Sequence, residues 1–128
     1  MAKVLIVEDD VAIRAVLTRL LAASGYTVLW AADGARAVRL AREELPDLIL
    51  MDLGLPILNG WQAAHRIKGR PATAHIPIIA LTAYALTEER ERSLAAGCDD
   101  FETKPLDIPR LLAKIEQHLG TRDRPEVQ

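Results

Sequence analysis

Short apolar runs and longer amphipathic segments alternate along almost the whole chain. Val4–Val7 is the first apolar run, and the segment after it carries hydrophobic residues at helical spacing as far as Ser24-Gly25. The same alternation repeats and predicts five strands, at residues 4–7, 27–31, 48–51, 78–81 and 99–103. It also predicts five helices, which begin at Asp9 or Asp10, Asp33-Gly34, Asn59-Gly60, Thr87 and Asp107.

One face of each predicted helix is expected to pack against the sheet. The inward residues are Ile13, Val16, Leu17, Leu20 and Leu21 in the first helix, Ala37, Val38 and Ala41 in the second, Trp61, Ala64 and Ile67 in the third, and Ile108, Leu111, Leu112, Ile115 and Leu119 in the last. The helix after Thr87 has a weaker apolar face, with little beyond Leu94 and Ala95.

Strict alternation of strands and helices predicts an α/β fold with a parallel sheet. The uninterrupted apolar run 48–51, which ends at Asp52, is typical of a strand that is buried on both faces. In such folds the functional residues lie at the carboxyl ends of the strands, near the point where the strand order reverses. The polar residues that follow the predicted strands are therefore the candidates for chemistry.

Length and composition narrow the class of protein. The 128 residues suit one domain, which we assign to residues 1–120, followed by a polar tail at residues 121–128. The formal net charge of −2 gives no overall field that attracts nucleic acid, and no apolar run approaches the ~20 residues of a membrane-spanning helix. The single cysteine, Cys98, cannot form an internal disulfide, and residues 1–30 lack the pattern of a signal peptide. We expect a cytoplasmic protein that binds neither nucleic acid nor membranes.

Acidic residues dominate the ends of the predicted strands. The candidates are Glu8, Asp9 and Asp10 after the first strand, Asp52 at the end of the third, Thr82 after the fourth, and Lys104-Pro105 after the fifth. Taken singly, Asp10 is explained as a helix cap, Thr82 as a turn hydroxyl and Lys104 as a solvated amine. Carboxylates from two strands at one sheet edge repel each other, however, and Mg²⁺ is a suitable counter-charge. With that metal, a carboxylate can attack a phosphoryl group, while a hydroxyl and an ammonium stabilise the phosphoryl oxygens.

Four stretches of the chain resemble the receiver (response regulator) family of two-component signalling. They are VLIVEDD (4–10), LILMDLGLPILNG (48–60), PIIALTAY (77–84) and GCDDFETKP (97–105). Each stretch is weak alone, but their order and spacing are specific, since Thr82 follows Asp52 by thirty residues and Lys104 follows Thr82 by twenty-two. The resemblance covers Lys3 to Leu119 and is greatest to single-domain regulators of the chemotaxis and cell-cycle type. It implies a flavodoxin-like, doubly wound sheet of five parallel strands in the order 2-1-3-4-5, with five helices.

The resemblance also implies a phosphorylation site. Asp52 is the expected phosphoacceptor, and Thr82 and Lys104 are expected to contact phosphoryl oxygens. The implied cofactor is Mg²⁺, with Mn²⁺ as an alternative, and its expected ligands are Asp9, Glu8 through water, Asp52 and the backbone carbonyl of Gly54.

Further roles implied by the resemblance concern switching and signal lifetime. Phe101 occupies the position of an aromatic switch that works together with Thr82, and the peptide bond before Pro105 is expected to be cis. Gly54 and Tyr84 flank the approach of the hydrolytic water. The implied partners are a sensor histidine kinase or a histidine phosphotransfer protein, and a downstream target protein. The implied state is a monomer or a dimer promoted by phosphorylation, and the only reactions expected are phosphorylation and dephosphorylation of the chain itself.

Several other residues are assigned to packing or to solvent. His65, His75, Arg36, Arg39 and Arg42 are predicted to be solvated, Cys98 to be a small buried thiol, Trp30 and Trp61 to pack, and His118 to suit the end of the last helix.

Rival functions remain open on sequence alone. The chain ends soon after the last predicted helix, which favours a stand-alone module over a receiver detached from a longer regulator or hybrid kinase. A haloacid-dehalogenase-like phosphatase needs an acid two residues after the nucleophile, where this chain has Gly54. The nucleotide-binding patterns GxxxxGK[ST] and GxGxxG do not occur, and a flavodoxin-type electron carrier gives no reason for the carboxylates.

Overall fold

A parallel five-stranded sheet forms the centre of the protein. The computed structural model describes residues 2–55, 58–83, 91 and 94–120. The strands are β1 (Lys3–Val7), β2 (Thr27–Ala31), β3 (Leu48–Asp52), β4 (Ile78–Thr82) and β5 (Asp100–Thr103). All pairings are parallel and the order is β2-β1-β3-β4-β5, which confirms the predicted fold class.

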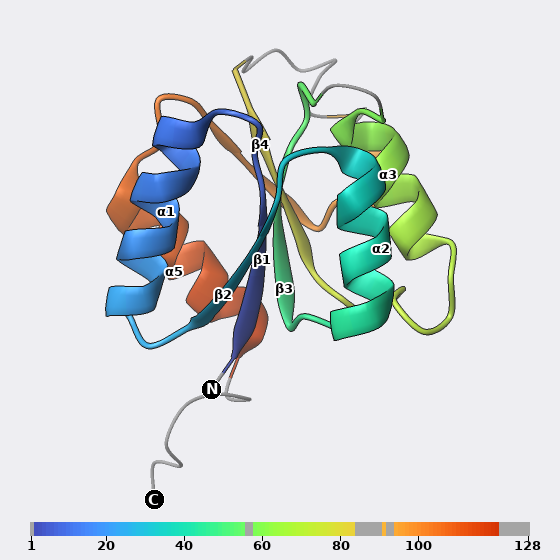
Figure 1. The fold of residues 1–128 in the computed structure, drawn as a ribbon, viewed down its shortest axis with the longest axis horizontal. Helices are drawn as coiled ribbons and strands as arrows, with labels where there is room; N and C mark the ends of the chain where they lie inside the picture. Colours follow the sequence, from blue (N-terminus) through green and yellow to red (C-terminus); the bar gives the residue numbers. More distant parts are fainter. Residues whose placement is uncertain (1, 56–57, 84–90, 92–93, 121–128) are drawn as a thin grey trace, which may run out of the picture.

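Helices cover both faces of this sheet. Helices α1 (Val11–Ala23) and α5 (Ile108–Leu119) lie on one face, and α2 (Gly34–Glu44) and α3 (Gly60–Lys68) lie on the other (Figure 1). Two cores result because the three central strands, β1, β3 and β4, are buried from both sides. Leu17, Leu21, Leu111 and Ile115 pack with one face of the sheet, and Ala37, Ala41, Ala64 and Ile67 pack with the other.

The helix starts follow from local hydrogen bonding. The side chains of Asp10, Asp33, Asn59 and Asp107 each accept a hydrogen bond from a backbone amide in the first turn of the helix that follows. These are the predicted boundaries, with Asp10 as the cap of α1. Most of the helix predicted after Thr87 lies outside the described residues, although Glu91, Leu94 and Ala95 are helical. The tail at 121–128 also lies outside them.

Some predicted core residues prove to be exposed. Val16 is 54% exposed on α1, contrary to its assignment to the inner face. Leu17 and Leu21 already fill the contact between α1 and the sheet, so Val16 lies at the margin of the apolar stripe. Trp30 on the edge strand β2 is 48% exposed, and its ring packs under the guanidinium of Arg14 rather than into the core.

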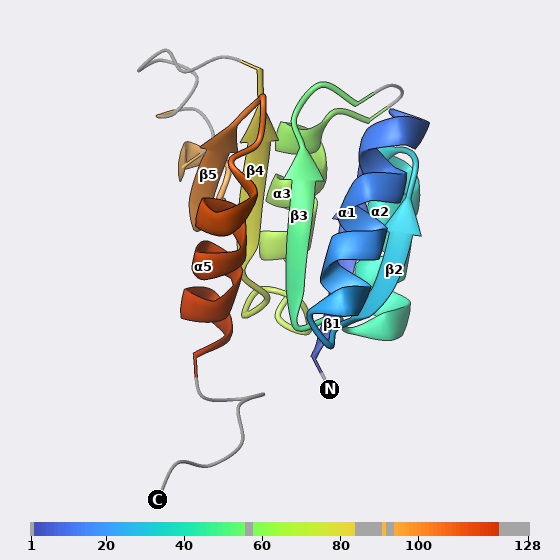
Figure 2. The same ribbon diagram turned by 90° about the vertical axis from the view of Figure 1, so that its left-hand side faces the viewer.

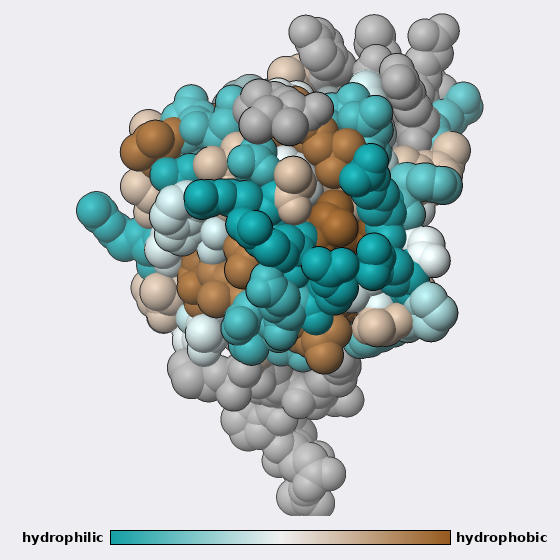
Figure 3. All heavy atoms as spheres, turned by 45° about the vertical axis from the view of Figure 1, so that its right-hand side comes forward, coloured by the Kyte–Doolittle hydropathy of each residue, from teal (hydrophilic) through white to brown (hydrophobic). Residues whose placement is uncertain are grey.

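The surface over α2 and α3 is mostly polar. Figure 3 turns this side toward the viewer and shows hydrophilic residues over much of it, with apolar residues in small separate patches. The predicted solvent exposure of Arg36, Arg39, Arg42, His65 and His75 is confirmed. Cys98 is buried and unpaired, and burial raises the pKa of its thiol to about 12, as expected of an inert packing residue. None of the helices in the described ranges has the length and apolarity to span a bilayer.

The parallel arrangement decides where the polar strand ends meet. All pairings are parallel, and the arrows of β2, β3 and β4 can be followed toward the same end of the sheet in Figure 2. The residues after β1, β3, β4 and β5 are therefore gathered at one edge.

Candidate functional site

Two acidic residues with different exposure follow β1. The backbone amide of Glu8 donates to the carbonyl of Ala31, which continues the pairing of β1 with β2 and carries Glu8 into the interior. Glu8 is only 1% exposed, whereas Asp9 is exposed. The next residue, Asp10, uses its carboxylate to cap α1, so its ordinary structural explanation is confirmed.

Asp52 is the last residue of β3, the strand at the middle of the sheet. It is 7% exposed, and its Oδ1 accepts a hydrogen bond of 3.1 Å from the backbone amide of Gly54. Carboxylate oxygens of Glu8, Asp9 and Asp52 lie within 4.8 Å of one another. The structure therefore brings together the three acids that the sequence predicted as metal ligands.

Lys104 enters the same cluster from the end of β5. Its Nζ lies 2.8 Å from Glu8 Oε1 and 3.5 Å from Asp52 Oδ1. Its backbone amide donates to the carbonyl of Thr82 at 2.7 Å, which holds the ends of β4 and β5 together. The peptide between Lys104 and Pro105, predicted to be cis, is cis in the structure. Lys104 is therefore not the solvated amine of the alternative reading.

Burial and the neighbouring groups shift the proton affinities of Glu8 and Lys104. Burial raises the pKa of Glu8 to about 7, assisted by the neighbouring Asp52 and opposed by Lys104. Burial by itself would lower the pKa of the Lys104 amine, but its bonds and charge interactions with Glu8 and Asp52 outweigh this and raise it. One ammonium thus serves two buried carboxylates, with the exposed Asp9 beside them. The site carries excess negative charge.

This excess fits a hard divalent cation. The cluster supplies oxygen donors from three carboxylates, one of them open to solvent, which are the ligands that Mg²⁺ prefers. Gly54 is exposed and lies directly beside Asp52, so its backbone borders the same space. A cation at this place would oppose the burial and the interaction with Asp52 that together raise the pKa of Glu8.

Thr82 and Phe101 lie on neighbouring strands behind the cluster. Thr82 ends β4 and is 5% exposed, and Phe101 is partly buried in β5. In the register Ala80 faces Phe101 and Thr82 faces Thr103, so Thr82 and Phe101 project from the same face of the sheet. Tyr84, predicted to influence hydrolysis, lies outside the described residues.

Two residues that support the site were not singled out from the sequence. Arg14 donates from Nη1 to the carbonyl oxygen of Glu8 at 3.2 Å while its guanidinium lies 4.0 Å from the Trp30 ring centre. Gly60 packs so closely on β3 that a Cβ there would collide with the backbone oxygen of Asp52. The only sequence signal at Gly60 was a helix start, and Arg14 carried no signal beyond its place one turn into α1. Their contacts depend on packing between segments distant in sequence.

Known proteins match nearly the whole chain. The family model described as the response regulator receiver domain matches residues 4–116. The polar-differentiation response regulator DivK of Brucella anthropi is 39% identical over 117 residues, which cover 91% of this chain and 95% of that protein.

Solved structures also match nearly the whole chain. The receiver domain of the sensor histidine kinase PA1611 from Pseudomonas aeruginosa, with a magnesium ion coordinated in its active site cleft, has a TM-score of 0.87 at 39% identity, covering 93% of this chain and 98% of that one. A chain in the co-crystal structure of the Saccharomyces cerevisiae histidine phosphotransfer protein Ypd1 with the receiver domain of Ssk1 has a TM-score of 0.87 at 34% identity, covering 94% of this chain and 90% of that one.

Proposed function

The chain belongs to the response regulator receiver domain family of two-component signalling, and we propose that Asp52 accepts a phosphoryl group and thereby switches the chain's protein partners. The observation that carries this proposal is the convergence of Glu8, Asp52 and Lys104 from three strands, with the Lys104 ammonium within 3.5 Å of both carboxylates. An aspartate held among oxygen donors and one fixed cation is suited to nucleophilic attack on phosphorus.

The phosphoryl transfer uses one carboxylate oxygen of Asp52. The Gly54 amide and Lys104 hold Oδ1, and we assign the attack to the other oxygen. A bond forms between that oxygen and phosphorus as the bond from phosphorus to the donor's imidazole nitrogen breaks, and the imidazole leaves with the electron pair. Water later attacks phosphorus, which returns Asp52 as a carboxylate and releases inorganic phosphate. The chain promotes only these reactions of its own aspartate.

The residues around Asp52 divide the remaining work. Asp9, Glu8 and Asp52, with the backbone carbonyl of Gly54, would hold Mg²⁺ or Mn²⁺, which when bound neutralises charge on the phosphoryl oxygens and orients them. The Lys104 ammonium moves from its present bond with Glu8 toward a phosphoryl oxygen, and the Thr82 hydroxyl donates to another. Glu8 and Asp52 are then relieved of their mutual repulsion.

The proposed phosphoryl donor is a histidine kinase or a histidine phosphotransfer protein. A groove of about 400 Å³ adjoins the site, between Ala12, Ile13 and Val16 of α1 and the Lys104–Leu106 segment. Its lining is apolar apart from Lys104, which supports docking of a donor's apolar helix face that brings histidine to Asp52. The exposed Val16 belongs to this wall. Val16→Glu is expected to slow transfer from a phosphorylated histidine protein without slowing transfer from a small phosphodonor. Equal slowing with both donors would contradict this docking surface.

The proposed output is a change in protein binding. Attraction of the Thr82 hydroxyl to the phosphoryl group alters the space into which Phe101 turns, and the surface near β5 changes with it. The partner is a downstream protein, and the chain is proposed to act as a monomer or as a dimer promoted by phosphorylation. The unpaired Cys98 suits action in the reducing cytoplasm, and the net charge of −2 gives no support to nucleic acid as a partner.

Phosphate uptake tests the proposal directly. The full chain incubated with Mg²⁺ and acetyl phosphate is expected to gain one alkali-labile phosphate, located by mass spectrometry on the peptide that contains Asp52. Omission of Mg²⁺ provides the control and should abolish the uptake. A stable phosphate on a serine or threonine, or none at all, would contradict the proposed function.

A further inference from the structure

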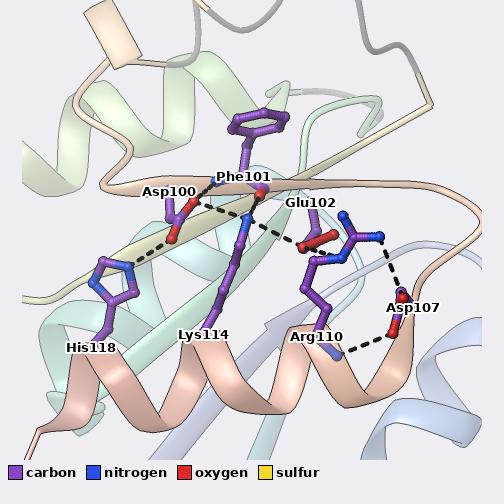
Figure 4. Close-up of polar contacts among 7 residues, drawn as sticks. All are labelled: Asp100, Phe101, Glu102, Asp107, Arg110, Lys114 and His118. Atoms are coloured by element: carbon purple, nitrogen blue, oxygen red, sulfur yellow. Dashed lines mark hydrogen bonds and ion pairs between the residues drawn. The ribbon is translucent and has the colours of Figure 1, made fainter.

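Lys114 of α5 is the centre of a polar cluster on the edge strand β5. Its Nζ donates to the backbone oxygen of Phe101 at 2.6 Å and lies 3.2 Å from Asp100 Oδ1 and 3.1 Å from Glu102 Oε1 (Figure 4). The ammonium donates a hydrogen bond to the Phe101 carbonyl, and the two carboxylates lie within ion-pair distance, with Glu102 Oε1 itself accepting no hydrogen bond from the described residues. The Lys114 side chain is 23% exposed, and the position of its charge is fixed by three groups at once.

The cluster surrounds one residue of the proposed switch. Asp100 and Glu102 flank Phe101 in sequence, and their carboxylates point toward α5 on either side of its carbonyl (Figure 4). The same ammonium lies 5.2 Å from the centre of the Phe101 ring, within the range of a cation–π contact. Lys114 therefore holds Phe101 by both its backbone and its ring.

The other basic residues of the cluster do not share this arrangement. Arg110 pairs with Glu102 and Asp107, and its side chain is 63% exposed. His118 lies 3.0 Å from Asp100 Oδ2. Of these three residues, Lys114 is the one that bonds to the Phe101 carbonyl and contacts its ring.

We propose that Lys114 is a positioning residue that holds Phe101 in its resting orientation, so that α5 sets the balance of the switch. The inference rests on the proposed role of Phe101. When the ring turns toward Thr82 it leaves the ammonium, whereas the bond to the carbonyl keeps β5 in place. Loss of Lys114 removes the contact that favours the resting orientation of the Phe101 ring. The ring should then turn toward Thr82 more often, even when Asp52 carries no phosphate.

A fluorine probe tests this at one atom. Phe101 is the single phenylalanine of the chain, so expression with 4-fluorophenylalanine places one fluorine in the full-length protein. The measurement is the solvent isotope shift of the fluorine NMR signal between H₂O and D₂O, which reports exposure of the ring and not merely the nearby charge. Lys114→Met keeps the length of the side chain and removes the ammonium.

Two matched controls separate positioning from general loss of charge or stability. Arg110→Met removes another cation that pairs with Glu102. Lys68→Met removes a lysine of similar exposure that bonds to the carbonyls of Ala74 and Ile76 at the other end of the sheet. In resting protein, we expect a smaller isotope shift in Lys114→Met and the wild-type value in both controls. Lys114→Arg retains a cation and should restore part of the wild-type value.

The outcomes are distinct. An unchanged or larger isotope shift in Lys114→Met, or an equal change in Arg110→Met, would overturn the role of Lys114. If Lys114→Met does not fold, Lys114→Met combined with Glu102→Gln removes the unpaired buried charge and is measured in its place. Acetyl phosphate and Mg²⁺ then test the proposed function separately: phosphate on Asp52 should reduce the isotope shift in wild type but not in Thr82→Ala. Absence of phosphate uptake would refute that function while the resting comparison still decides the role of Lys114.

Discussion

Each end of the sheet has a lysine whose side chain is largely buried, but the two lysines have different partners. At the amino end, Lys68 Nζ donates to the carbonyls of Ala74 and Ile76 and lies 2.8 Å from Asp99 Oδ2. The same Asp99 oxygen accepts a hydrogen bond from the Ile78 amide. At the carboxyl end, Lys104 faces Glu8 and Asp52, with Asp9 beside them.

The difference separates a structural ion pair from a reactive one. Around Lys68 a single carboxylate balances a single ammonium, and backbone groups satisfy the remaining bonds. Around Lys104 carboxylates outnumber the cation, and the pKa of Glu8 is raised to about 7, first by burial and then by Asp52. Excess charge that the fold does not neutralise is a feature of functional sites, because it favours binding of a ligand with the opposite charge.

The largest expected effect comes from replacing the acid at each end of the sheet, Asp52 or Asp99, with its uncharged amide. Asp52→Asn should abolish phosphate uptake, weaken Mg²⁺ binding and raise the melting temperature slightly without Mg²⁺, because an uncharged isostere relieves carboxylate repulsion. Asp99→Asn should leave uptake intact and lower the free energy of unfolding by about 1 kcal/mol. Mass spectrometry and thermal melts measure these effects. Full phosphorylation of Asp52→Asn would contradict the assignment of the acceptor.

Replacing the two lysines should separate rate from stability. Lys104→Met removes a donor to the phosphoryl oxygens and should slow uptake from acetyl phosphate by roughly 10²-fold. Lys68→Met leaves two carbonyls without this donor and Asp99 without its counter-charge, and it should lower the free energy of unfolding by roughly 1–3 kcal/mol with little change in rate. Initial rates and urea unfolding test the pair. Similar slowing in both variants would mean that the two ends do not differ as argued.

Sequence patterns predicted the fold well because the three central strands, β1, β3 and β4, are buried on both faces. Runs such as Leu48–Met51 have no other stable place in a chain of this size, and caps such as Asn59 fixed the helix starts to within a residue. The prediction for Val16 was wrong because helical spacing defines a stripe but not its width. Whether an apolar residue at the margin of that stripe is buried depends on how closely the neighbouring segment packs.

The gathering of Glu8, Asp52 and Lys104 followed from parallel topology together with the family resemblance. Their individual distances did not, since these depend on the strand register and on the loop before α5. The roles of Arg14 and Gly60 were missed for the same reason. His118 was assigned to the end of a helix, yet its ring bonds to Asp100 across to β5. Contacts between elements distant in sequence carry no local signal.

Glu8 provides a smaller, pH-dependent test of the contrast. Because its pKa in the folded state, about 7, lies above the ordinary value of 4.5, the folded chain binds the extra proton. Without Mg²⁺, the contribution of Glu8 to the free energy of unfolding should therefore be highest in acid and fall as pH rises from about 4.5 to about 7. Mg²⁺ displaces this proton, so its affinity should rise roughly tenfold from about pH 6 to about pH 8. Calorimetric titration with Mg²⁺ at each pH measures this affinity.

Two variants test whether Glu8 is the source of the pH dependence of Mg²⁺ binding. Glu8→Gln should remove most of the pH dependence of Mg²⁺ binding, whereas Asp99→Asn should retain it. An affinity in wild type that is flat over this range would show that Glu8 is already ionised, and the proposed repulsion would be wrong.

The smallest expected effect concerns the lifetime of the phosphorylated state. A Cβ at Gly54 would lie 3.8 Å from Asp52 Oδ1, an ordinary contact distance, so the backbone accepts a side chain that begins beside Asp52. Gly54 has no side chain to orient a water, and we propose that Tyr84 shields the phosphoryl group from one. Tyr84→Ala and Gly54→Asn should each speed dephosphorylation by roughly threefold to tenfold, a change of about 1 kcal/mol in barrier. Gly69→Asn, at the other end of the sheet, is the control. Phosphate release is followed after the donor is removed.

Tyr84→Phe separates shielding by the ring from any effect of the Tyr84 hydroxyl on the attacking water. If shielding dominates, Tyr84→Phe keeps the slow wild-type rate of dephosphorylation. A rate in Tyr84→Ala that is unchanged or slower would refute shielding.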